Sequence, residues 1–126
     1  MGTQITDTGA RAVLALRSME ANAFRVSQVT TRLLDDHTDL PDLLAVRPQA
    51  TGSAAQLDLQ ARTIEDARTW AAALGGTLRV EDTEHLNGWS ASADVVVDGV
   101  TVHVCAFQHY SAEERAERGA AAVVAA

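Results

Sequence analysis

The clearest alternation of apolar and polar positions lies in residues 90–107, SASADVVVDGVTVHVCAF. Two runs rich in valine flank Asp98 and Gly99, and an Asp-Gly pair between such runs is a strong signal for a two-residue type I′ turn. The sequence therefore predicts a β-hairpin. The turn also fixes the register, so that valines and alanines from both strands share one face as the core.

The same register pairs the remaining residues on the opposite face. Asp94 is expected opposite His103, and Val96 opposite Thr101. A carboxylate beside an imidazole can orient the ring for acid–base chemistry or metal binding. It is also an ordinary cross-strand charge pair, and we expect this structural role. A nucleophilic cysteine needs a positively charged neighbour, and no arginine is expected near Cys105 in the hairpin. We therefore expect Cys105 to pack as a small hydrophobic residue.

Residues 8–35 show the spacing of an amphipathic helix. Its apolar positions are Val13, Leu16, Met19, Ala23, Val26, Thr30 and Leu33, with Phe24, Val29 and Leu34 broadening the stripe. We expect one long helix, or two helices that break near residues 20–22. The arginines lie mostly off this stripe, which is typical of a solvated face, with a partner-docking face as the alternative. Residues 1–6 are expected to be a disordered start.

Residues 36–53 contain two prolines and are expected to form a linker or a short strand. Residues 54–61 then alternate strictly, as a half-buried strand does. Thr63 and Asp66 form a capping pair that opens a helix over 63–75, which Gly75-Gly76 closes. Residues 77–81 are expected to be a short strand with its leucine and valine inward. The carboxylates around His37, at the start of the linker, have no regular metal-ligand spacing.

After the hairpin, Ser111 and Glu114 form a capping box that starts a short helix over 111–119 carrying a Glu114–Arg118 pair. Residues 120–126 are expected to be a frayed end, with a small adhesive segment as the alternative. The chain is thus expected to be one α+β domain: a helical segment at 8–35, a linker at 36–53, a βαβββ core at 54–107, a helix at 111–119 and a tail. The core would hold a four-stranded, mostly antiparallel sheet.

Charge narrows the classes of partner. The 126 residues carry a formal net charge of −7, and residues 64–126 hold ten acids against four arginines. Nucleic acid is therefore an unfavourable partner, since phosphate contacts need clustered basic residues, whereas a basic protein partner is favoured. No apolar run approaches the length of a membrane span, and the first residues do not resemble a secretory signal. With one cysteine, these features indicate a cytoplasmic protein with no membrane partner.

The order strand, helix, strand, strand, strand in residues 54–107 resembles one module of the glyoxalase/bleomycin-resistance proteins of the vicinal oxygen chelate superfamily. The resemblance is carried by the first strand Leu57-Asp58-Leu59, the helix that ends in Leu74-Gly75, and the closing hairpin. It implies that modules from two chains join their sheets around a metal or an organic ligand. The family places His or Glu on its first strand and Glu on its last; here a metal site could be assembled only from Asp58, Asp94 and His103.

No P-loop, dinucleotide-binding glycine motif, zinc-protease motif or serine-centred elbow is present in the sequence. We therefore expect a non-catalytic, homo-oligomeric interaction or accessory module without a cofactor, of a kind common in bacteria and their phages. Its expected interface is the mixed second face of the sheet: Val96, Thr101, Cys105 and Phe107. The alternative is a dimeric, single-module oxygen-chelate-type protein that binds a small molecule or a metal across the dimer.

Overall fold

The structure, a computed structural model, describes residues 7–125. Its elements, in chain order, are α1 (Asp7–Asp36), β1 (Leu43–Ala50), β2 (Ala55–Ala61), α2 (Ile64–Ala73), β3 (Arg79–Thr83), the 3₁₀ helix η1 (Glu84–Leu86), β4 (Gly88–Val97), β5 (Val100–His109) and α3 (Ala112–Ala125). The α+β class is confirmed, and residues 7–36 form one helix rather than two. The expectation for residues 1–6 lies outside the described residues.

The strands form one five-stranded sheet in the order β1-β2-β5-β4-β3. The expected number of strands, four, was wrong, whereas three of the four strand pairings are antiparallel, in line with a mostly antiparallel sheet. Residues 43–50, in the segment expected to be a linker or a short strand, form the edge strand β1, which pairs antiparallel with β2. The sheet is also mixed, because α2 and the β3–β4 hairpin carry the chain to the far edge before β5 returns parallel to β2.

The predicted hairpin is confirmed, with Asp98 and Gly99 both at positive φ, 48° and 79°. Its register pairs Val97 with Val100 and Asp94 with His103. The Asp98 carboxylate also forms an ion pair with Arg32 of α1. The turn therefore sets the strand register and anchors the hairpin to the long helix.

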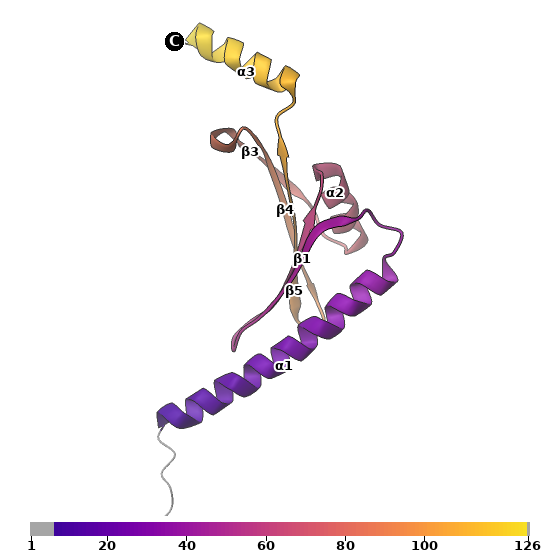
Figure 1. Ribbon diagram of the computed structural model, residues 1–126, viewed down its shortest axis with the longest axis vertical. Helices are drawn as coiled ribbons and strands as arrows, with labels where there is room; N and C mark the ends of the chain where they lie inside the picture. Colours follow the sequence, from indigo (N-terminus) through magenta and orange to yellow (C-terminus); the bar gives the residue numbers. More distant parts are fainter. Residues whose placement is uncertain (1–6, 126) are drawn as a thin grey trace, which may run out of the picture.

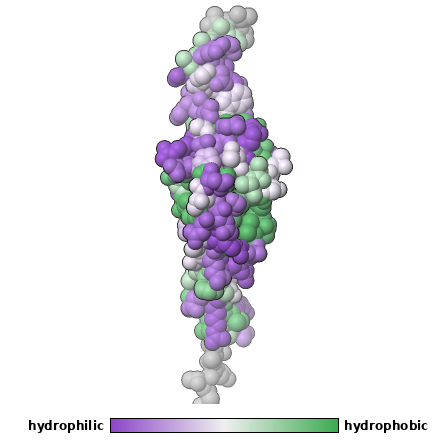
Figure 2. All heavy atoms as spheres, turned by 90° about the vertical axis from the view of Figure 1, so that its right-hand side faces the viewer, coloured by the Kyte–Doolittle hydropathy of each residue, from purple (hydrophilic) through white to green (hydrophobic). Residues whose placement is uncertain are grey.

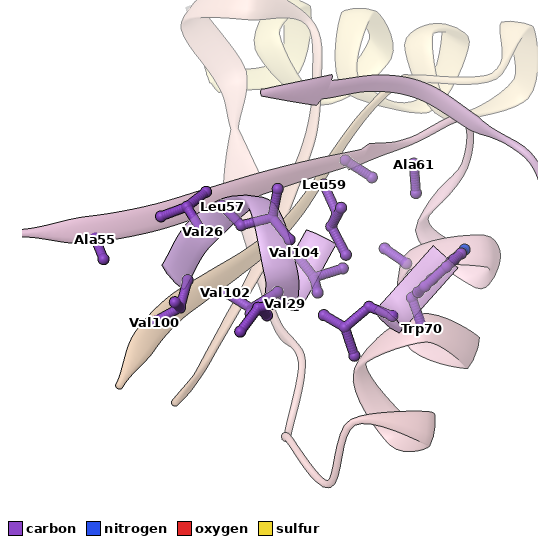
Figure 3. Close-up of a cluster of buried hydrophobic side chains, with 13 residues drawn as sticks. Val26, Val29, Ala55, Leu57, Leu59, Ala61, Trp70, Val100, Val102 and Val104 are labelled. Atoms are coloured by element: carbon purple, nitrogen blue, oxygen red, sulfur yellow. The ribbon is translucent and has the colours of Figure 1, made fainter. Parts of the chain in front are cut away.

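Both α1 and α2 pack on the valine face of the sheet, and α1 and α3 project from its opposite ends, which makes the molecule elongated (Figure 1, Figure 2). Figure 3 shows side chains from α1, α2, β2 and β5 meeting in one apolar layer. Leu57, Leu59 and Val102 at its centre have no exposed surface. Trp70 of α2 closes one side and donates from its indole nitrogen to the Pro41 carbonyl oxygen at 2.8 Å. The ring thereby joins the α1–β1 connection to the core.

Only the C-terminal part of α1 belongs to this core. Its buried residues are Val26, Val29 and Leu33. The Asn22 amide donates to the Thr51 carbonyl oxygen at 2.8 Å, which ties the helix to the β1–β2 turn. At 1.5 Å per residue a 30-residue helix is about 45 Å long, whereas a ten-residue strand spans about 33 Å. The N-terminal part of the helix therefore extends beyond the sheet (Figure 1).

The C-terminal helix is longer than the expected 111–119, because it continues through Gly119 to Ala125. Its predicted capping box is confirmed: the Ser111 hydroxyl accepts from the Glu114 amide at 3.1 Å, and the Glu114 carboxylate accepts from the Ser111 amide at 3.0 Å. Arg118 does not form the expected ion pair with Glu114. It pairs instead with Asp82 at 2.8 Å and Glu84 at 3.2 Å. Among the described residues, no helix combines the length and the apolar character needed to cross a membrane.

Candidate functional site

The face of the sheet opposite the helices carries a row of ionisable side chains. Strand register aligns Arg47 of β1 with Asp58 of β2, Asp58 with His103 of β5, and His103 with Asp94 of β4. The three residues that we predicted as ligands therefore lie on neighbouring strands at one level of the sheet. Arg47, in the segment expected to be a linker or a short strand, is a fourth member that was not predicted from the sequence.

Within this row, Asp94 and His103 form a surface pair, and the row does not form a closed site. His103 Nδ1 lies 2.6 Å from Asp94 Oδ1, and their side chains are 33% and 58% exposed. Asp58 instead accepts a hydrogen bond from the Gln56 amide at 2.8 Å. Within residues 7–125, no three His, Cys, Asp or Glu side chains are placed so that they could hold a metal ion.

Cys105 lies next to this row and is half-buried. Removal from water, and to a smaller extent the charge of Asp58, raise the pKa of its thiol, while Arg47 opposes them. The thiol therefore remains protonated near neutral pH and is a weak nucleophile.

The four predicted interface residues lie on this same face but do not form one apolar patch. Val96, 70% exposed, and Thr101 lie at the turn end of the hairpin. Phe107 lies toward the other end of the strands, where its ring packs against the backbone of Gly88 and contacts His109 edge-on, with 4.9 Å between ring centroids. The row of ionisable side chains separates these two groups of residues. The four residues therefore do not make a continuous apolar surface on this face.

Large exposed apolar side chains are instead concentrated on the N-terminal part of α1. Val13 is 46% exposed, Leu14 62%, Leu16 54% and Phe24 65%. Val13 and Leu16 belong to the predicted apolar stripe, but the buried residues of α1 begin only at Val26. In Figure 2, hydrophobic and hydrophilic residues alternate over the narrow lower part of the molecule, where α1 extends beyond the sheet.

A groove between α1 and β1 adjoins this part of the helix. Its volume is about 390 Å³, and its wall is mostly apolar. From α1 it is lined by Ala23, Val26, Ser27, Thr30 and Thr31, and from β1 by Pro48, Gln49 and Ala50. The groove lies beside the free edge of β1, where Pro48 lacks a backbone N–H donor.

At the opposite end of the sheet, a cluster of side chains around Arg118 holds α3 against β3, η1 and the end of the β4–β5 hairpin. The guanidinium group lies over the rings of Tyr110 and Trp89, and the Trp89 indole donates to the Glu114 carboxylate at 2.7 Å. Tyr110 is 3% exposed and donates its hydroxyl to Asp82. Burial, reinforced by that hydrogen bond, raises the pKa of Tyr110 to about 12. The same hydrogen bond, followed by Arg118, lowers the pKa of Asp82.

The sequence analysis missed this cluster because its members are far apart along the chain. The only local signal was the capping box at Ser111, which predicts where the helix starts but not what it contacts. All of its polar groups are paired within the chain, which indicates a structural fastening.

No family model, curated protein or solved structure matches this chain.

Proposed function

We propose that this protein is a non-catalytic interaction module that self-associates through the N-terminal part of α1. The observation that carries the proposal is the exposure of Val13, Leu16 and Phe24 on the N-terminal part of α1, outside the buried stretch that starts at Val26. Apolar side chains gathered on such a projecting helix are typical of a surface that a partner covers. In proteins most of the stability of a helix comes from packing of its apolar side, so an uncovered part of a helix gains stability from a partner.

The charge of the N-terminal part of α1 favours self-association over binding of a strongly basic or strongly acidic partner. Residues 7–25 carry three arginines and two acids, so this segment is close to neutral in a chain with a net charge of −7. A second copy would therefore meet little electrostatic repulsion there, whereas the acidic second half of the chain disfavours close approach of another copy.

The chemistry of the residues that could take part in catalysis favours a binding role over an enzymatic one. The Cys105 thiol has a raised pKa, and the Asp94–His103 pair lies on an open, solvated face. Water on such a face weakens the electrostatic stabilisation that catalysis requires.

Sedimentation equilibrium over a range of concentrations tests the proposal. We expect the wild-type protein to show a reversible increase in mass toward twice that of the 13.3 kDa chain. A variant with Val13→Ser, Leu16→Ser and Phe24→Ser should remain at the monomer mass with unchanged circular dichroism from the sheet. The control, Val96→Ser, removes an even more exposed apolar side chain from the sheet and should associate like the wild type. A wild-type protein that stays monomeric at every concentration would refute the proposal.

A second candidate function is ligand or metal binding across a dimer of the oxygen-chelate type. The alignment of Asp58, Asp94 and His103 at one level of the open face favours it. Metal analysis of the purified protein, combined with its mass in solution, tests this candidate. Stoichiometric metal that is lost in the His103→Ala variant would support it, and metal-free protein after supplementation with zinc or manganese would contradict it.

A further inference from the structure

The exposed side of α1 has a self-complementary order of residues. Val13, Arg17, Glu20 and Phe24 recur at intervals of four, three and four, which places them on one side of a helix. We call these four residues the α1 stripe. Reading toward the C-terminus, the stripe is apolar, positive, negative, apolar. A reversed copy therefore presents an apolar residue to each apolar residue and an opposite charge to each charge.

The stripe faces away from the body of the protein. At 100° per residue, its mean direction lies about 180° from that of the buried residues Val26, Val29 and Leu33. A second helix could therefore pack on the stripe without meeting the sheet of its own chain or of the other copy. The resulting arrangement would have four layers: sheet, helix, helix and sheet.

The charged members of the stripe are available for such contacts. Arg17 and Glu20 are both exposed, and neither forms an ion pair or a side-chain hydrogen bond within the described part of the chain. Other charged residues of α1 behave differently: Arg32 pairs with Asp98, and Arg25 lies against the turn at Gly99. The side of α1 that touches the hairpin thus uses its arginines internally, while the stripe leaves its charges free.

We propose that two copies of this chain pair through α1 in antiparallel orientation, related by a two-fold axis near residues 18 and 19. Val13 then faces the partner's Phe24, and Arg17 faces the partner's Glu20, each contact occurring twice. This inference rests on the proposed function, and it adds the orientation, the register and the chemistry of the contact. Because the stripe is only about 17 Å long, the interface is smaller than that of a standard stable complex, and we expect a dissociation constant in roughly the micromolar range.

Charge reversal tests the predicted chemistry. Arg17→Glu alone places two acids opposite each other twice, and Glu20→Arg alone does the same with two arginines. We expect each variant to weaken the dimer about tenfold or more, and the double variant, with both changes in one chain, to restore it. Arg11→Glu is the matched control: it makes the same change in net charge on the same helix outside the stripe, and it should leave the dissociation constant within about threefold of the wild-type value.

Cross-linking tests orientation and register. In a Cys105→Ser background, the double variant Val13→Cys and Phe24→Cys should form disulfide-linked dimers in which peptide mapping joins residue 13 of one chain to residue 24 of the other. Val13→Cys alone should cross-link poorly, because the two copies of residue 13 are about 17 Å apart along the paired helices. Efficient 13-to-13 cross-links would indicate parallel helices and overturn the inference.

The outcomes separate this inference from the function on which it rests. A wild-type protein that never dimerises would overturn both. A wild-type dimer that is insensitive to Arg17→Glu and Glu20→Arg, and that yields no 13-to-24 cross-link, would leave self-association intact and overturn the antiparallel register.

Discussion

The guanidinium carbon of Arg118 lies 3.9 Å from the centroid of the Tyr110 ring, so a residue of α3 covers the last aromatic residue before that helix. The same guanidinium group pairs with Asp82 of the edge strand β3 and with Glu84 of η1. One arginine thus joins α3 to two other segments of the chain through stacking and charge. This relationship explains why a helix with little apolar packing has a fixed position.

Replacement of Arg118 by alanine should release α3 while the sheet remains folded. We expect faster amide hydrogen exchange in residues 112–121 and a red shift of Trp89 fluorescence, since the indole loses its cover. Arg115→Ala is the control, because Arg115 is exposed on the same helix and has no ion pair among the described residues. Equal exchange in both variants would contradict the role assigned to Arg118.

Titration of Tyr110 gives a direct test of that cluster, because it is the only tyrosine in the chain. Ultraviolet absorbance at high pH should report a pKa of about 12 for the folded protein, against the ordinary value of 10.0 in denaturant. Because folding raises this pKa, its contribution to stability is complete below pH 10 and is lost as the pH rises toward about 12. Tyr110→Phe should remove this alkaline loss. Native-state ionisation near pH 10 would show that the hydroxyl is open to water.

Truncation of Leu59 should be among the most damaging single changes. Leu59 has no exposed surface and lies at the centre of the apolar layer, so Leu59→Ala should lower the free energy of unfolding by about 2–5 kcal/mol in urea denaturation. Val96→Ala, at a position that is 70% exposed, should change it by less than about 0.5 kcal/mol. Similar losses in the two variants would mean that the assigned core is misplaced.

The same substitution at two glycines should act in opposite directions. Gly99 has a φ of 79°, so Gly99→Ala should cost about 1–2 kcal/mol through backbone strain. Gly119 lies inside α3 with no neighbouring atom within 4 Å of an added methyl group, so Gly119→Ala should stabilise that helix by up to about 1 kcal/mol. Thermal unfolding measures both. Destabilisation by both variants would contradict the helical assignment at residue 119.

Local signals explain why much of the fold could be predicted from the sequence. Asp98 and Gly99 determine the hairpin because both positions need positive φ, and Thr63 starts α2 by accepting from the Asp66 amide at 3.1 Å. The predicted opposition of Asp94 and His103 followed from that turn alone. In contrast, the segment that holds β1 was left between a linker and a short strand, because Pro48 and a bulge near Leu43 disrupt its alternation.

Long-range relationships account for the remaining differences. Helical periodicity shows which side of α1 is apolar but not how much of that side the sheet covers, and so the exposure of Val13 and Leu16 could not be predicted. Asp58 was placed beside His103 by a parallel pairing that depends on the path of the whole βαβββ segment. The partners of Arg118 are 34 and 36 residues away, a separation at which the sequence holds no pairing rule.

The central claim, that a second copy covers the projecting part of α1, is tested most directly by amide hydrogen exchange measured at several protein concentrations. The account predicts that protection in residues 10–25 rises with concentration in the range where the mass increases, while protection in α3 stays constant. Exchange in residues 10–25 that does not depend on concentration, in a sample whose mass doubles, would contradict it.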